Sequence, residues 1–206
     1  YKLGVEPFFF STATDRYAPE TYAKVTQYFT IFGSLILLFA GSYTHVIKHL
    51  LVPNPAYWEA LNIVPVILLS NFCLGIYHSL SVWYKVTDCT WYGAYISISG
   101  GIITIITNLI LIPIMGYFGS ALATLLAYGS MMIISFWVGQ KKYPIPYNLK
   151  KILAYLLTSV SLTCINFYIL GKNLIVGTFF VILFMTMIFY FERKELLFIL
   201  RTARKK

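Results

Sequence analysis

Apolar residues in this chain come in long runs separated by short polar stretches, and they do not follow the spacing of a helix with one water-facing side. A helix that crosses a membrane needs about 20 mainly apolar residues, because each residue advances by about 1.5 Å. The runs between charged residues are of this length and predict six spans. The predicted spans cover residues 28–47, 61–83, 92–114, 117–138, 152–170 and 174–191.

The third and fourth spans share one uncharged stretch of 52 residues, at positions 89–140. As a single helix this stretch would be about 78 Å long, far more than one crossing requires. Pro113, Gly116 and Gly119 are typical of a turn and divide the stretch in two. Residues 1–10 resemble the end of a helix that begins earlier, so we expect the chain to be a fragment of a longer protein.

Composition favours a membrane protein over a soluble domain with an unusually large core. Hydrophobic residues make up 59% of the 206 residues, charged residues make up 11%, and the mean hydropathy is +0.74. A soluble domain carries about 25% charged residues, so this chain could not cover a water-facing surface. The predicted fold class is all-α: a polytopic membrane helix bundle of about six transmembrane helices, preceded by an N-terminal helix stub.

Basic residues between the spans predict the orientation, because cytoplasmic loops of membrane proteins are enriched in Lys and Arg. An even number of spans places both ends of the chain on one side. Thirteen of the sixteen Lys and Arg residues fall on that side, only Lys48 and Lys172 fall on the other, and Lys2 lies in the stub. We therefore expect a cytoplasmic C-terminus. The net charge of +9 follows the loops rather than one face, which argues against a nucleic-acid partner.

The sequence carries no signature of catalysis or of a bound metal. It contains no glycine-rich phosphate loop after a strand and neither the HExxH nor the GxSxG motif. Cys73, Cys89 and Cys164 have neither metal-ligand nor CxxC spacing. Acidic residues near the spans are few. We therefore expect a transporter or scaffold and not an enzyme, with no catalytic residues, no metal and no cofactor.

Lys2 and Glu6 are four residues apart, so on a helix they share one face and can pair. If the stub lies in the membrane, both are ionisable groups in or near hydrocarbon, where such residues usually face a cavity or a partner. They are candidates for a cationic site that receives an anionic substrate, with Glu6 orienting the Lys2 ammonium group. The alternative is that both lie at the membrane–water boundary.

Asn71, His78 and Asn108 are polar residues in otherwise apolar runs. Such side chains either bond to a neighbouring helix or line an aqueous cavity. Both interpretations remain open from the sequence.

Three basic residues in the expected cytoplasmic connections, Lys85, Lys141 and Lys142, are candidates for contacts with lipid phosphates or an anionic headgroup. The alternative is that they only anchor the topology. The segment at residues 194–201 either lies along the inner membrane surface as an amphipathic helix or forms an ordinary solvated tail.

Several short segments, taken in order, resemble the Wzx-type polysaccharide flippases of the MOP transporter superfamily. They are residues 6–10 (EPFFF), 22–24 (YAK), 75–77 (GIY), 81–88 (SVWYKVTD), 93–98 (GAYISI), 116–121 (GYFGSA) and 139–147 (GQKKYPIPY), with Asn108 and the Ile-Pro pair at 112–113 between them. The resemblance extends over nearly all of the chain.

The resemblance implies a protein of two six-helix lobes around a central cavity, often followed by two extra helices. On this map residues 1–146 are the C-terminal lobe (the end of one helix plus four transmembrane helices). Residues 147–206 are two additional transmembrane helices with a basic cytoplasmic tail, and the N-terminal lobe is absent. The chain is then expected to be the second lobe of a MOP-type transporter.

Members of this family move oligosaccharide units linked to undecaprenyl diphosphate across the bacterial inner membrane. The implied substrate-binding residues are Lys2, where the family usually has Arg, its orienting partner Glu6, and the cavity-lining Asn71, Tyr77 and Asn108. His78 stands where the family has Asn, so its assignment to the cavity departs from the family pattern.

The expected function is therefore transport of lipid-linked oligosaccharides for surface polysaccharide synthesis. The expected partners are this substrate and membrane lipids, for a protein that works as a monomer and could contact polysaccharide-assembly proteins. Two alternatives remain: a MATE-like exporter of small cationic drugs, whose cavity would be acidic, and a membrane polysaccharide-biosynthesis enzyme such as a polymerase. The short outer loop at about residues 48–59 argues against the polymerase.

Overall fold

The computed structural model describes residues 2–13, 15–52 and 54–203, with most side chains between residues 7 and 193. All regular secondary structure in these ranges is helical. Six segments are long and apolar enough to cross a membrane. They are α2 (Ala18–Ser42), η2–α4–α5 (Glu59–Val86), α6 (Trp91–Met115), α7 (Tyr117–Lys142), α8 with η3 (Leu149–Ile169) and α9 from Leu174 to Arg193. The chain is thus an all-α, multi-pass membrane helix bundle, as predicted.

Two of the spans are composed of more than one element. The second contains η2 (Glu59–Ile63), α4 (Val64–Leu80) and α5 (Val82–Val86), and the fifth contains α8 (Leu149–Cys164) and a π-helical turn, η3 (Ile165–Ile169). Outside the spans, α1 (Lys2–Thr12) forms the predicted stub, and α3 (Thr44–Leu51) and η1 (Pro55–Tyr57) connect α2 to η2. The last helix, α9 (Leu174–Ala203), continues beyond its span.

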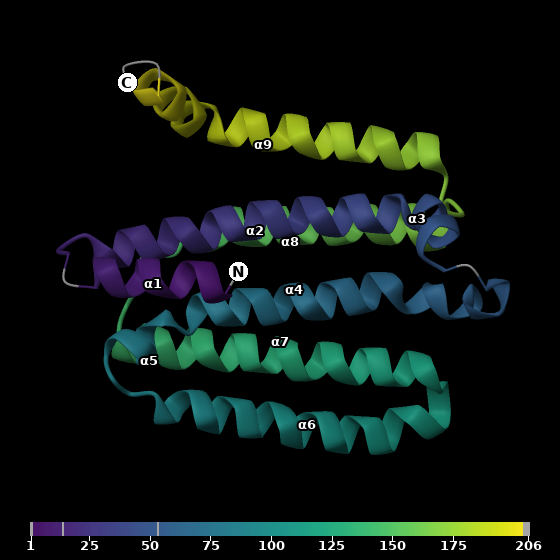
Figure 1. Ribbon diagram of the computed structural model, residues 1–206, viewed down its shortest axis with the longest axis horizontal. Helices are drawn as coiled ribbons and strands as arrows, with labels where there is room; N and C mark the ends of the chain where they lie inside the picture. Colours follow the sequence, from purple (N-terminus) through teal and green to yellow (C-terminus); the bar gives the residue numbers. More distant parts are fainter. Residues whose placement is uncertain (1, 14, 53, 204–206) are drawn as a thin grey trace.

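The spans lie side by side in the order α6, α7, α4, then α2 with α8, then α9 (Figure 1). α7 packs between α4 and α6, and α2 contacts α4, α8 and α9. α6 and α9 therefore form the two edges. Only Ile96 and Gly100 of α6 are buried, so most of its surface is left for lipid.

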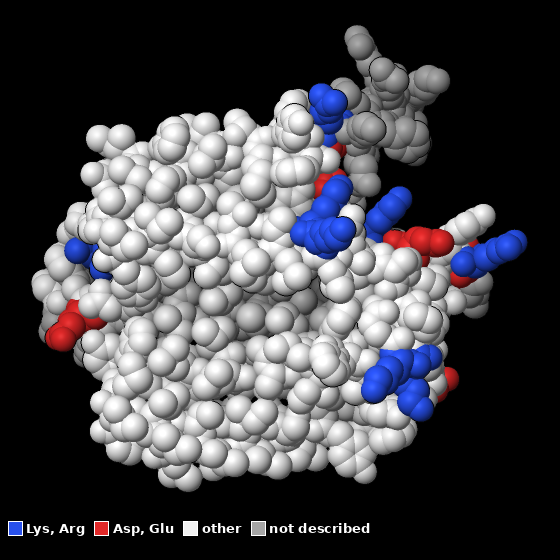
Figure 2. All heavy atoms as spheres, turned by 180° about the vertical axis from the view of Figure 1, so that it is seen from behind, with Lys and Arg blue, Asp and Glu red and all other residues white. Residues whose placement is uncertain are grey.

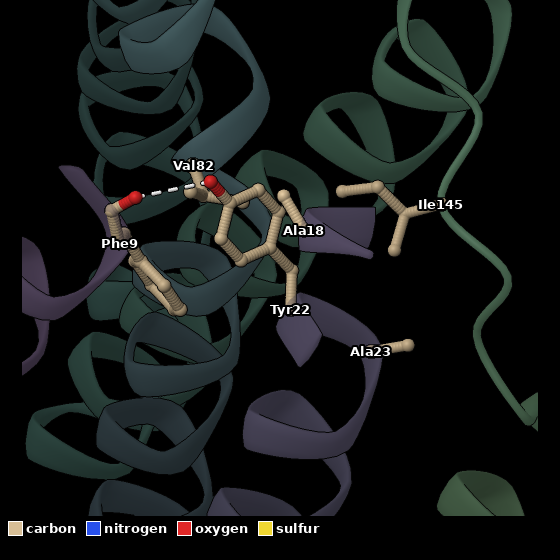
Figure 3. Close-up of a cluster of buried hydrophobic side chains, with 6 residues drawn as sticks. All are labelled: Phe9, Ala18, Tyr22, Ala23, Val82 and Ile145. Carbon is tan, nitrogen blue, oxygen red and sulfur yellow. Dashed lines mark hydrogen bonds between the residues drawn. The ribbon is translucent and has the colours of Figure 1, made fainter. Parts of the chain in front are cut away.

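The stub is attached to the bundle by the cluster in Figure 3. The hydroxyl group of Tyr22 donates a hydrogen bond to the carbonyl oxygen of Phe9 over 3.0 Å, and the two rings meet edge to face with centroids 5.1 Å apart. The cluster joins α1, α2, α5 and the connection between α7 and α8. Its buried members are Phe9, Ala18, Tyr22, Ala23, Val82 and Ile145.

The predicted spans stop at charged residues, whereas the helices continue through some of them. The first span was predicted from residue 28, but α2 begins at Ala18 and carries Glu20 and Lys24 in its first turns. A helix pairs its backbone groups internally, so it can pass from lipid into water without ending. Pro65, predicted inside the second span, lies in the first turn of α4, where its missing N–H group costs little.

The turn between the third and fourth spans is a single residue. α6 ends at Met115 and α7 begins at Tyr117, with Gly116 between them at a φ of +56°, a conformation that favours glycine. Pro113 lies within the last turn of α6, and Gly119 lies within α7. A Cβ atom at Gly119 would collide with the carbonyl oxygen of Leu111, so glycine is needed for the close approach of the two helices.

Gly119→Ala is expected to destabilise the bundle, because the obstructing atom belongs to the backbone of α6 and cannot rotate away. Overpacking of this kind costs about 1–3 kcal/mol. The matched control is Gly129→Ala in the same helix, where a Cβ would meet nothing within 4 Å and where the better helix propensity of Ala contributes up to about 1 kcal/mol. Reversible denaturation in mixed micelles measures both variants, and equal stability of the two would contradict the close contact.

Candidate functional site

The charged side chains of the described residues gather at the two ends of the bundle, and most of the basic ones lie at one end (Figure 2). Lys141 and Lys142 are exposed in the last turn of α7, and Lys150 is exposed in the first turn of α8. Because α7 and α8 are joined by a short connection, these lysines belong to the same end. The separation agrees with the loop pattern used to predict orientation.

The predicted cationic pair cannot be placed in full. Lys2 and Glu6 both belong to α1, but their side chains lie outside the described residues. Their proposed contact with an anionic substrate therefore stays a prediction.

The other predicted cavity residues do not form one site. Asn71 is exposed on α4, and its Nδ2 donates to the carbonyl oxygen of Ile67 in the same helix over 2.9 Å. Tyr77 is buried, and its hydroxyl group lies 3.1 Å from that of Tyr84 in a core of aromatic and methionine side chains. The half-buried His78 lies beside it, with its ring centroid 5.3 Å from that of Tyr77.

Asn108 lies on α6, separated from the α4 residues by α7. Its Oδ1 atom is buried and has no hydrogen-bond partner. Of the predicted lipid-phosphate contacts, Lys85 is half-buried in α5, whereas Lys141 and Lys142 are exposed. The last two are therefore the more accessible to a headgroup.

A polar cluster that sequence reasoning missed centres on Glu192 of α9, whose exposed fraction is only 2%. Its Oε1 atom accepts three hydrogen bonds. The donors are Nε2 of Gln27 in α2 (2.9 Å), Nζ of Lys151 in α8 (2.8 Å) and the hydroxyl group of Tyr155 in α8 (2.8 Å). One carboxylate oxygen thus joins three helices.

The Glu192 cluster is charge-balanced but incompletely bonded. The Lys151 ammonium group forms an ion pair with Glu192, and the lysine side chain is 29% exposed, so it reaches water from the basic end. The other carboxylate oxygen, Oε2, is buried without a partner. A charge removed from water is tolerated only when it is paired and hydrogen-bonded. The cluster can therefore hold α9 against α2 and α8 at this end.

The sequence does contain a signal for this pair. Lys151 lies 20 residues before Gly171 and Glu192 lies 20 residues after Lys172, so opposite charges are equidistant from the turn between the last two spans. In an antiparallel pair of helices, two residues at equal distances from the turn lie at the same depth in the membrane. The signal was missed because the predicted sixth span ended at Phe191.

The opposite end carries a smaller basic cluster. The Lys48 ammonium group lies 4.2 Å from the centre of the Trp58 ring, and Lys172 lies 4.3 Å from that of Phe167. Burial, followed by the charge of Lys48, lowers the pKa of Lys172. The charge of Lys48 is also the main cause that lowers the pKa of His45. Positive charges here are close enough to disfavour one another.

An apolar groove with a volume of about 220 Å³ lies between α7 and α8. Residues of α2 and α4 also line the groove, and every lining residue except Thr26 has an aliphatic, thioether or aromatic side chain. The face seen in Figure 2 is hollowed midway between its upper and lower parts. A second depression shares Ile133 and Trp137 with the groove and extends to Lys141. The residues lining the groove are Thr26, Ile76, Leu80, Met132, Ile133, Phe136, Trp137, Tyr147, Leu149, Ile152, Leu153 and Leu156.

Comparison with known proteins gives no match: no family model, no curated protein and no solved structure is significantly similar to this chain. The helices themselves identify the chain as a multi-pass membrane bundle. Its function is inferred from the groove, the basic helix ends and the sequence resemblance.

Lys151→Met is expected to lower the free energy of unfolding by about 1–3 kcal/mol. This loss is smaller than that for breaking a fully buried ion pair, because the lysine is partly exposed. The control is Lys150→Met, its exposed neighbour, which should change stability by less than about 0.5 kcal/mol. The double variant Lys151→Met/Glu192→Gln should recover part of the loss, because no unpaired charge remains. Denaturation in mixed micelles measures these free energies of unfolding. If Lys151→Met is as stable as Lys150→Met, the ion pair does not stabilise the bundle.

Proposed function

We propose that this chain is part of a transporter in the bacterial inner membrane, with its C-terminus in the cytoplasm. Its substrate is an oligosaccharide unit linked to undecaprenyl diphosphate, which is moved to the periplasmic leaflet for O-antigen, capsule or exopolysaccharide synthesis. The sequence resemblance to Wzx-type flippases supports this proposal. The observation that carries it is the apolar groove that continues to a lysine-rich helix end.

The groove and the lysines match the two halves of such a substrate. A prenyl chain is apolar and flexible, and a groove of about 220 Å³ lined by aliphatic and aromatic side chains can hold one segment of it. A diphosphate is anionic, and Lys141 lies where the depression beside the groove ends. Lys142 is exposed next to it. A small-cation exporter would need acidic rather than basic residues at this position.

The proposed mechanism is alternating access, in which two lobes rock around a central cavity. The sugar head crosses in water while the lipid tail remains in apolar surroundings. No covalent bond is made or broken. The groove in this bundle would guide the tail, and Lys141 and Lys142 would meet the diphosphate at the cytoplasmic face. Lys2 with Glu6 would then receive the anionic head in the central cavity.

Deletion of the gene in its host tests the proposed function. Loss of surface polysaccharide, with the lipid-linked precursor accumulating on the cytoplasmic side, is the expected result. The intact gene should restore the polysaccharide and Lys2→Ala should not, whereas Lys24→Ala, at an exposed lysine of α2, serves as the control. Normal polysaccharide with raised sensitivity to toxic cations would instead identify a drug exporter.

Leu156→Trp tests the groove itself, because the larger ring would fill space where the lipid tail is expected. Transport of the lipid-linked oligosaccharide by the full-length protein in proteoliposomes should become about tenfold slower, equivalent to about 1.4 kcal/mol. The matched control is Leu157→Trp, which adds the same ring at a position that is 59% exposed and outside the groove. Equal rates for the two variants would exclude the groove as a tail site.

A further inference from the structure

The connection after the first span contains a short helix, α3, with two different faces. His45, Lys48 and His49 have i, i+3 and i+4 spacing, so they share one face of this helix. Val46 and Leu50 lie on another face, and their side chains are 50% and 82% exposed. A helix with a basic face and an exposed apolar face is typical of the boundary between lipid and water.

A second lysine, Lys172, is brought to this end of the bundle by the turn between the last two spans. Its Nζ atom donates to Oδ1 of Asn62 over 3.0 Å, and the hydroxyl group of Tyr168 donates to the carbonyl oxygen of the same asparagine over 2.9 Å. Burial lowers the pKa of Lys172, and the charge of Lys48 lowers it further. Three segments therefore converge here: α3, η2 and the turn before α9.

Aromatic rings fix the positions of both lysines. The Lys48 ammonium group lies 4.2 Å from the centre of the Trp58 ring, and that of Lys172 lies 4.3 Å from the centre of the Phe167 ring. Both distances are typical of a cation–π contact. The His49 ring meets Trp58 edge to face, with centroids 4.7 Å apart. These contacts position the charges without neutralising any of them.

The backbone at Lys172 is unusual. Its φ is +63°, in the left-handed region that favours glycine, and Gly171 before it has a φ of +64°. Non-glycine residues held in this region are concentrated at binding sites and active sites. The turn thus holds a lysine at a position that glycine would occupy with less strain.

No described carboxylate balances these positive charges. Among the described side chains, neither Lys48 nor Lys172 forms an ion pair, and Glu59 of η2 is exposed and forms none. The pKa of His45 is lowered mainly by the charge of Lys48, then by burial and by the charges of His49 and Lys172. The cluster therefore has an excess of positive charge that an anion would compensate.

The uncompensated charge selects the kind of ligand. His45 and His49 are four residues apart, a spacing that on a helix suits a metal ion. A metal cation would be repelled by the two lysines, and the described residues contain no group of three or more His, Cys, Asp or Glu side chains that could hold one. A phosphate group is an anion, and lysine binds it as a point charge. The cluster thus favours a phosphate group over a metal.

Exposed apolar residues beside the cluster indicate what carries the phosphate group. Leu50 of α3 is 82% exposed, and Ile169 and Ile175, on either side of the turn that holds Lys172, are 75% and 81% exposed. Side chains of this kind at the end of a membrane bundle contact the acyl chains of the surrounding lipid. The ligand is therefore expected to combine a phosphate group with a hydrocarbon chain.

We propose that Lys48 and Lys172, with His45 and His49 beside them, bind the phosphate group of an anionic phospholipid. The groove assigned to the tail of the cargo lies between α7 and α8 and includes none of these residues. The ligand of the cluster is therefore a lipid of the surrounding leaflet, and the proposal does not depend on the cargo. Bound in this way, the phospholipid links α3 to the turn before α9.

Acetylation of lysines in nanodiscs tests the site, because a bound phosphate group shields the ammonium groups from the reagent. The full chain is labelled in discs of phosphatidylglycerol and in discs of phosphatidylcholine with the same acyl chains. Lys48 and Lys172 should react about fivefold more slowly in phosphatidylglycerol, equivalent to about 1 kcal/mol for a lysine near an anionic surface. Lys48→Gln should remove most of the protection of Lys172, because the two lysines share one ligand. The control is Lys24→Gln, at an exposed lysine of α2, which should leave that protection unchanged.

Two results would overturn the proposal. The first is protection of Lys172 that Lys48→Gln leaves unchanged or that Lys24→Gln reduces equally, since the attraction would then be spread over the membrane surface. The second comes from phosphatidylcholine discs that contain added undecaprenyl diphosphate. Protection by this lipid, without protection by phosphatidylglycerol, would assign the cluster to the cargo instead of a phospholipid.

Thermal unfolding in the same discs provides an independent test. Lys48→Gln removes both the contact with Trp58 and the repulsion from Lys172, and these effects are the same in either lipid. Loss of a bound phospholipid adds to them only in phosphatidylglycerol, where Lys48→Gln should lower Tm by about 2–4 °C more than in phosphatidylcholine. An equal change of Tm in the two lipids would overturn the proposal.

Discussion

Hydrocarbon offers no hydrogen-bond partners, and this constraint determines the architecture. Each backbone N–H and carbonyl group in a span must be paired within its own segment, which leaves the helix as the form available to a single chain segment. Lipid is also as apolar as the side chains, so burial of apolar surface does little to hold helices together. Close packing of side chains against glycine backbones takes its place. Phe72 packs on Gly33, Met131 packs on Gly100 and Trp83 packs on Gly139, each from a neighbouring helix.

The same constraint explains how the polar side chains are used. Most hydroxyl groups bond to a carbonyl oxygen of their own helix, as Thr26 does to Tyr22 and Thr30 does to Thr26, both over 2.9 Å. Such bonds satisfy the side chain without linking helices. Several of the bonds between helices involve α9, which contacts its neighbours less than the central helices do. A hydrogen bond of 2.9 Å between the hydroxyl groups of Tyr43 and Thr178 holds α9 near its start, and the Glu192 cluster holds its other end.

The number and approximate position of the spans could be predicted because a run of about 20 mainly apolar residues is typical of a membrane-spanning helix. The helix limits were less predictable, since Glu20 and Lys24 end an apolar run without ending a helix. The single-residue turn at Gly116 depends on how closely two helices approach, which hydropathy does not record.

The candidate site was harder to predict. Asn71 and Asn108 were correctly recognised as polar residues in spans, but packing places them on helices separated by α7. Glu192 was overlooked because a charge at the edge of an apolar run was interpreted as the end of the span. The groove between α7 and α8 could not be found from the sequence, because it depends on the space that remains between packed helices, which hydropathy does not record.

The glycine turn between α6 and α7 has a consequence for the assembly of the protein in its membrane. The two helices form a hairpin that is uncharged from Trp91 to Gln140, and α6 packs mainly on α7. Its tip can therefore cross the bilayer without carrying any ionised group through the hydrocarbon. The hairpin can enter as one unit during synthesis, with Lys85 before it and Lys141 after it remaining on one side of the membrane. Close contact at Gly119 would then form within the hairpin before the last two spans are synthesised.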